Sequence, residues 1–238
     1  REPGRVDLGN TYLDTYELER SRGITIFSKQ AVFLLGDFSV TLLDTPGHVD
    51  FSAEMERALQ VLDYAVLVVS GADGVQGHTK TLWRLLKRYQ IPCFVFVNKM
   101  DQEGTDREGL LSELQSSLDE NCLDFGIGTG ELLESLAMCE ERLLESYLEQ
   151  GTLEKKEIRR LVRERKVFPC YFGSALKGDG VERFLEGLGD LMEEHSTPGE
   201  FGAKVFKISR DGQGNRLTHM KITGGSLKVK ESLAGKEP

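Results

Sequence analysis

Strand-length apolar runs alternate with segments of helical periodicity along most of this chain, and this alternation restricts the fold more than any other feature. Predicted strands cover residues 64–70, 93–97 and 167–172, and predicted helices cover residues 51–62, 79–89 and 181–194. Strands that are separated by helices pair in parallel through right-handed crossovers. The pattern therefore predicts an α/β fold with a doubly wound, mostly parallel sheet.

Further β-rich and helical segments surround this alternation. Residues 24–35 and 38–43 flank a Gly-Asp turn and predict a β-hairpin. Residues 102–166 are charged and helical, apart from a looser patch at residues 124–130. We interpret this region as a helical insert whose charged runs are mostly solvated helix faces.

A stretch containing Pro and Gly near the end of the chain separates helix-rich from strand-rich sequence. After it, residues 203–209, 216–223 and 227–229 predict successive antiparallel strands. We therefore expect one domain at residues 1–197 and, at residues 198–238, the first strands of a truncated all-β barrel domain.

The composition limits the partners that we expect. The 39 acidic and 30 basic residues give a formal net charge of -9, which argues against a surface that coats nucleic acid and against sequence-specific DNA binding. The longest apolar runs have only strand length, so we expect no membrane partner. Four cysteines without CxxC spacing indicate reduced thiols in a cytoplasmic protein.

Unusual polar residues follow the predicted strands. The segment DTPGH begins at Asp44, NKMD begins at Asn98, and GSAL begins at Gly173. In doubly wound sheets, ligands bind at the carboxyl ends of the strands. We therefore expect these three segments to contribute to one ligand site.

The NKMD segment has the groups that guanine recognition requires. A carboxylate such as that of Asp101 accepts two parallel hydrogen bonds from adjacent N–H groups, which guanine offers and adenine does not. Asn98 and the aliphatic stem of Lys99 would brace and cover the ring, and the backbone of Ser174 and Ala175 would donate to the base oxygen. The alternative is a polar turn after a buried strand.

The DTPGH segment suits the phosphate end of a nucleotide. An acid at the end of a strand, here Asp44, can hold a hydrated Mg²⁺, and Gly47 lets a backbone N–H approach a terminal phosphate. His48 would position and polarise an attacking water, and the hydroxyl of Thr25 could ligate Mg²⁺. Alternatively, His48 is a loop histidine bonded for structure, and Thr25 is an ordinary residue of a β-rich segment.

The ordered set RGITI, DTPGH, NKMD, GSAL resembles the GTP-binding domain of translational GTPases. The stretches ELERSRGITI, DTPGHVDF and VLDYAVLVVSGADGVQ are similar to elongation factor G and its relatives, and KVFKISRDGQGNRLTHMKITGGSLKVKESL resembles the opening strands of their second-domain barrel. The short helical insert and NKMDQEGTD are more similar to the ribosomal-protection tetracycline resistance proteins. The resemblance covers nearly the whole chain.

This resemblance implies a P-loop GTPase fold that binds GTP, GDP and Mg²⁺ and acts on the ribosome, where GTP hydrolysis drives a conformational switch. It implies that Thr25 and Asp44 are linked to Mg²⁺, that Gly47 senses the γ-phosphate, and that His48 is catalytic. The implied nucleotide contacts are Asp44, Thr45, Pro46, Gly47 and His48 in the first loop, Asn98, Lys99, Met100 and Asp101 in the second, and Ser174, Ala175 and Leu176 in the third.

The chain departs from the family in one motif. The phosphate-binding loop GxxxxGK followed by Ser or Thr, which precedes RGITI in the family, does not occur in this sequence. We therefore expect a fragment of a larger GTPase that lacks the first strand and phosphate loop, binds GTP weakly and is inactive alone. The alternative is a non-catalytic, guanine-nucleotide-responsive binding module. A signalling or trafficking GTPase is disfavoured by His48 and by the β-rich end.

Overall fold

The computed structural model describes residues 28–47, 52–126, 129–194 and 199–231. The chain divides into two compact units, Arg1–Glu193 and Glu194–Pro238, and each is described here by itself. The first unit contains the sheets and helices that position the candidate site.

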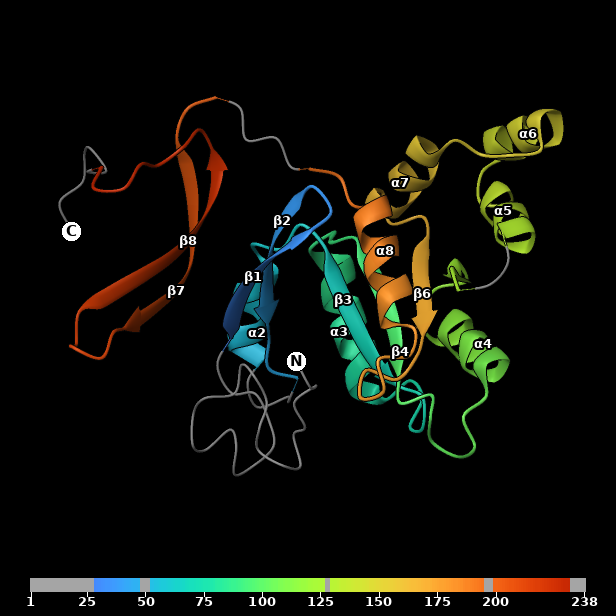
Figure 1. Cartoon of the computed structure of the whole chain (residues 1–238), viewed down its shortest axis with the longest axis horizontal. Helices are drawn as coiled ribbons and strands as arrows, with labels where there is room; N and C mark the ends of the chain where they lie inside the picture. The colour runs from blue at the N-terminus through green and yellow to red at the C-terminus, as the bar shows by residue number, and fades with distance from the viewer. Residues whose placement is uncertain (1–27, 48–51, 127–128, 195–198, 232–238) are drawn as a thin grey trace. The chain divides into compact units, whose positions relative to one another are not determined.

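A four-stranded parallel sheet forms the centre of the first unit (Figure 1). Its strands lie in the order β3 (Ala65–Ser70), β4 (Cys93–Asn98), β6 (Phe168–Phe172) and β5 (Cys122–Asp124). Every residue of β6 and all but the last residue of β4 are buried. Such continuous burial is typical of inner parallel strands, whose two faces are both covered by helices.

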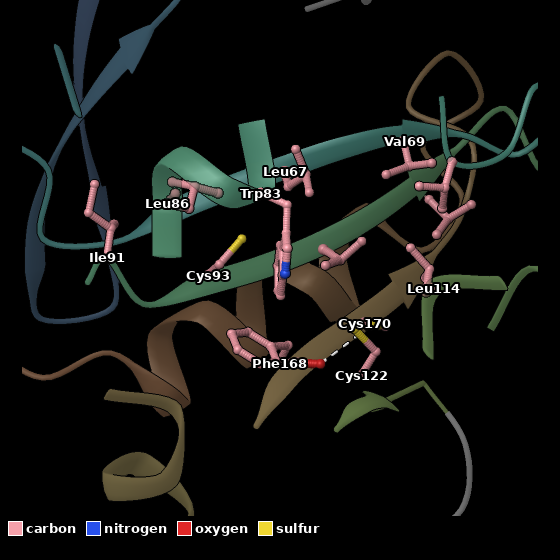
Figure 2. Close-up of a cluster of buried hydrophobic side chains, with 14 of the residues drawn as sticks. Leu67, Val69, Trp83, Leu86, Ile91, Cys93, Leu114, Cys122, Phe168 and Cys170 are labelled. Carbon is pink, nitrogen blue, oxygen red and sulfur yellow. Dashed lines mark hydrogen bonds between the residues drawn. The ribbon is translucent and has the colours of Figure 1, made fainter. Parts of the chain in front are cut away.

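Helices cover both faces of this sheet. On one face, α2 (Ser52–Leu59), α3 (Gly77–Arg88) and α4 (Arg107–Ser117) pack against the core shown in Figure 2, in which the Trp83 ring lies edge-on to Phe168 with ring centroids 4.6 Å apart. On the other face, α8 (Val181–Leu191) packs against side chains of β4 and β6. The predicted doubly wound α/β fold is therefore confirmed.

The helical insert has a small core of its own. Within the predicted insert at residues 102–166, α4 packs on the main sheet, whereas buried leucines of α5 (Thr129–Ala137), α6 (Glu141–Gln150) and α7 (Lys155–Arg163) meet in this small core. Arg160 of α7 donates to Glu157 at 3.0 Å and to Glu164 at 2.8 Å. Hydrogen bonds from Arg160 and Lys166 lower the pKa of Glu140 to about 2. The insert is thus held by both apolar packing and an ion-pair network.

The insert region also contains a strand that the sequence did not predict. β5 lies within the stretch interpreted as helical, and it pairs in parallel with β6 at one edge of the sheet. Three residues are too few to show a two-residue period, so the strand is defined by its partner rather than by its own pattern. The prediction of an uninterrupted helical region up to residue 124 was wrong at this point.

The predicted hairpin is confirmed over the residues that the structure describes. β1 (Lys29–Leu35) and β2 (Phe38–Asp44) pair antiparallel around a turn in which Gly36 has a φ of 57°. They form a separate two-stranded sheet that is not hydrogen-bonded to β3. On β3, Val66 and Val68 are 40 % and 59 % exposed. The start of the predicted hairpin, residues 24–27, lies outside the described residues.

The second unit contains an antiparallel pair, β7 (Gly202–Arg210) and β8 (Arg216–Gly224). Both strands were predicted, as was the change to β structure, but the strand expected at residues 227–229 is absent from the described part of this unit. Instead, the Glu231 N–H donates to the Lys228 carbonyl at 3.1 Å, and Lys230 has a φ of 68°. A short β-prone run forms a strand only where a neighbouring strand satisfies its backbone groups. Closure of this hairpin into a barrel stays a prediction.

Candidate functional site

Two of the three predicted loops meet at the carboxyl ends of the neighbouring strands β4 and β6. Asn98, the last residue of β4, accepts the N–H of Lys99 at 2.8 Å and the N–H of Ala175 at 2.9 Å through the same side-chain oxygen. The Met100 N–H donates to the Gly173 carbonyl at 3.0 Å. Parallel pairing of β4 with β6 brings these distant segments together, as the sequence predicted.

Asp101 lies in this cluster as an ionised carboxylate. A hydrogen bond with the Ser174 side chain lowers its pKa most, and the ammonium group of Lys177, 3.5 Å from its Oδ2 atom, lowers the pKa further. An ionised carboxylate only accepts hydrogen bonds. Asp101 therefore offers acceptors to a base edge that carries two N–H groups.

The backbone of the NKMD loop has an unusual conformation at Lys99. This residue has a φ of 64°, in the left-handed region that a lysine rarely adopts. Hydrogen bonds of Asn98 and Met100, which flank Lys99, hold the turn in place and compensate for the strain. The Lys99 side chain at this turn is exposed.

The GSAL loop is compact because its glycines allow close backbone approach. A Cβ atom on Gly173 would lie 2.1 Å from the Asp179 carbonyl oxygen, so no larger residue fits there. The Ser174 N–H donates to that same carbonyl at 2.9 Å, and Ser174 is 2 % exposed. Leu176 is 47 % exposed. The loop therefore presents a fixed backbone and the apolar side chains of Ala175 and Leu176 at its surface.

The structure adds residues that the sequence did not single out. Lys177, directly after GSAL, contacts Asp101 as described above. Gly71 donates its N–H to the Asn98 carbonyl at 2.7 Å, and the Thr105 hydroxyl donates to the Met100 carbonyl at 3.0 Å. Lys177 could have been found from the sequence, because it directly follows GSAL. The contacts of Gly71 and Thr105 could not, because they arise only when the loops fold.

The third predicted loop begins at the end of β2. Asp44 and Thr45 are half-buried, Pro46 is buried and Gly47 is exposed. His48 and Thr25 lie outside the described residues. The phosphate, Mg²⁺ and catalytic roles of this segment therefore stay predictions that rest on the motif.

Within the described residues, no group of three or more His, Cys, Asp or Glu side chains could hold a metal ion. A Mg²⁺ ion bound with a nucleotide needs only one or two protein oxygens, because phosphates and waters supply the others. The single carboxylate of Asp44 fits that arrangement. None of the helices in the described part of the chain is long and apolar enough to span a membrane.

The fold is a doubly wound α/β domain with polar loops at the carboxyl ends of adjacent strands, where such folds bind ligands, and comparison with known proteins specifies the family. The family model described as elongation factor Tu GTP binding domain matches residues 1–194. The chain therefore belongs to this family, the translational GTPases.

Several relatives are tetracycline resistance proteins. The chain is 38% identical to the oxytetracycline resistance protein of Streptomyces rimosus, covering 98% of the chain and 39% of that protein. It is 36% identical to TetM of Streptomyces lividans, covering 97% and 40%. A crystal structure of a protein from Thermus thermophilus has a TM-score of 0.83 at 27% identity, covering 96% of this chain and 42% of that one. The chain thus spans about two fifths of the length of these proteins.

Proposed function

We propose that the whole protein is a ribosome-dependent GTPase of the tetracycline ribosomal-protection type. The observation that carries this proposal is the cluster of Asn98, Asp101 and Ser174 at the ends of two adjacent parallel strands. The cluster has an ionised acceptor for guanine on one side and backbone donors on the other. The similarity to tetracycline resistance proteins favours this subfamily over elongation factor G itself.

In the proposed complex, the Asp101 carboxylate accepts the two N–H groups of guanine. The Ala175 N–H, which donates to the Asn98 side-chain oxygen at 2.9 Å, would be shared with the base oxygen, and Asn98 holds the two loops at a fixed separation. Lys99 and Leu176 cover the ring. Adenine presents no pair of adjacent donors to Asp101, so the site would reject it.

At the other end of the nucleotide, Asp44 and Thr25 would hold Mg²⁺, which supplies charge neutralisation on the phosphates when it is bound. Gly47 would approach the γ-phosphate through its backbone N–H, and Thr45 and Pro46 would shape that loop. His48 would orient the attacking water, because phosphoryl transfer depends chiefly on alignment and charge stabilisation. Loss of the γ-phosphate would release the loops and change the shape that binds the ribosome.

We further propose that residues 1–197 form the GTP-binding domain and residues 198–238 begin a second, barrel-shaped domain of a cytoplasmic protein. This chain by itself would bind GTP weakly and hydrolyse it at no useful rate. Backbone N–H groups and a lysine in a phosphate loop normally supply most of the contacts to the α- and β-phosphates, and the sequence carries no such motif.

GTP hydrolysis by the whole protein, with and without ribosomes, tests this function. His48→Ala is the test variant, and His219→Ala is the matched control, since His219 lies in β8 and bonds Ser209. We expect ribosomes to stimulate hydrolysis strongly in the wild type and in the control but not in His48→Ala. An absence of hydrolysis under every condition would instead support the non-catalytic binding module.

A further inference from the structure

Arg107, the first residue of α4, forms a two-point ion pair with Asp124, the last residue of β5. The guanidinium Nε and Nη2 atoms donate to the two carboxylate oxygens at 2.6 and 2.8 Å. Only 3% of the Asp124 side chain is exposed. A carboxylate buried to this degree needs its cation, because removal of one partner of a buried pair is strongly destabilising. The pair therefore fixes the plane of the guanidinium.

That plane lies over the ring of Phe172, with the central guanidinium carbon 4.9 Å from the ring centroid. Phe172 ends β6 and directly precedes Gly173. Gly173 is bonded to the neighbouring β4 segment on both sides, to the Val97 carbonyl at 2.9 Å and to the Met100 N–H at 3.0 Å. The orientation of Phe172 therefore bears directly on the loop that supplies the serine of the candidate site.

The backbone of Arg107 is connected to the other loop of the site. Asp106 caps α4 by accepting the N–H groups of Glu108 and Gly109 at 3.3 and 3.0 Å. One residue earlier, Thr105 donates its hydroxyl to the Met100 carbonyl at 3.0 Å. The start of α4 is thus attached to the NKMD loop by its chain and to the GSAL loop by the Arg107 side chain.

We propose that Arg107 is a positioning residue for guanine recognition. Its guanidinium, held by Asp124, contacts Phe172 and so sets the spacing between Asp101 and the GSAL loop. The inference rests on the proposed guanine site, because this spacing matters only where a base binds between the loops. Guanine spans it, with two N–H groups on the Asp101 carboxylate and its oxygen on the backbone donors opposite.

The readout is the discrimination of GDP from inosine diphosphate by the whole protein, measured by titration calorimetry. Inosine diphosphate lacks the 2-amino group, so the ratio of the two dissociation constants reports how well the second N–H meets Asp101. Loss of one hydrogen bond to a charged group corresponds to a ratio of about 10- to 150-fold. A change in overall stability alone does not alter this ratio.

Two variants separate positioning from folding. Arg107→Lys keeps the charge but loses the planar two-point pair with Asp124 and the guanidinium contact with Phe172. Arg107→Met combined with Asp124→Asn removes both charges and keeps an acceptor for the Gly126 N–H, which donates to Asp124 at 2.7 Å. Arg142→Lys is the matched control, since Arg142 forms a 2.7 Å ion pair with Glu157 in the helical insert.

We expect the double variant to melt near the wild-type temperature and the ratio to shrink by at least about threefold in both Arg107 variants, because small misplacement of contacting groups is costly. The control should keep the wild-type ratio. A folded double variant with an unchanged ratio would overturn the positioning role while leaving the guanine site intact. A wild-type ratio near one would overturn the guanine site itself, and the positioning role with it.

Discussion

Replacement of Asp101 by Asn converts an acceptor-only group into one with an acceptor and a donor at nearly the same positions. The oxygen of the amide still accepts one N–H of guanine, but its NH₂ group faces the second guanine N–H. The variant therefore loses one charge-assisted hydrogen bond and places two donors against each other. Because the amide has nearly the shape of the carboxylate, the change keeps the packing of the loop while it removes the ion pair with Lys177.

A hydrogen bond to a charged group contributes about 1.5–3 kcal/mol. We therefore expect Asp101→Asn to weaken GDP binding by about 10- to 150-fold. Xanthosine diphosphate has an oxygen in place of the 2-amino group, so it offers an acceptor to the new NH₂ group, and its affinity should rise in the variant.

Titration calorimetry of the whole protein with both nucleotides measures this exchange. Asp73→Asn is a suitable control, because Asp73 is exposed in the loop after β3. Unchanged GDP affinity in Asp101→Asn, with no gain for xanthosine diphosphate, would refute the assignment of this carboxylate to the base edge.

Three further predictions concern stability and reactivity. The pKa of Glu140 in the folded protein is about 2, below its ordinary 4.5, so its ion pairs stabilise the fold above about pH 4.5 and are lost as the pH falls to about 2. The free energy of unfolding, measured in urea, should therefore fall less over this pH range in Glu140→Gln than in the wild type. Burial raises the pKa of the Cys93 thiol to about 12, and Cys122 and Cys170 are buried as well. A thiol reagent should therefore label only the half-buried Cys139 before unfolding. Rapid labelling of a second cysteine would contradict this. A Cβ on Gly71 would lie 2.8 Å from a methionine sulfur, so Gly71→Ala should lower the free energy of unfolding by about 1–3 kcal/mol in denaturant melts, whereas Gly77→Ala, with open space at its Cβ, should not lower it.

The sequence predicted the parts of the fold whose patterns are local. β4 and β6 are continuous apolar runs of strand length, and α3 and α8 have clear helical periodicity, so their type and order were readable. Parallel pairing then placed Asn98 near Ser174, which made the shared site a prediction from topology. Elements that depend on a partner were not readable: β5 exists because β6 lies beside it, and residues 227–229 form no strand.

The same division applies to the candidate site. Asn98 and Asp101 were predicted because an Asn and an Asp at this spacing in the NKMD segment fit the recognition of guanine. The left-handed backbone of Lys99 and the approach of Gly71 to the Asn98 carbonyl arise from tertiary contacts that leave no local pattern. The ion pair of Arg107 was missed because its partner belongs to a strand that was itself missed.

The relative affinity of the whole protein for GDP and ADP tests the central claim most directly. If Asp101 and the GSAL backbone read guanine, GDP should bind at least about 100-fold more tightly than ADP, since adenine leaves the carboxylate without its donors. Equal affinities for the two nucleotides would contradict a guanine site at the ends of β4 and β6.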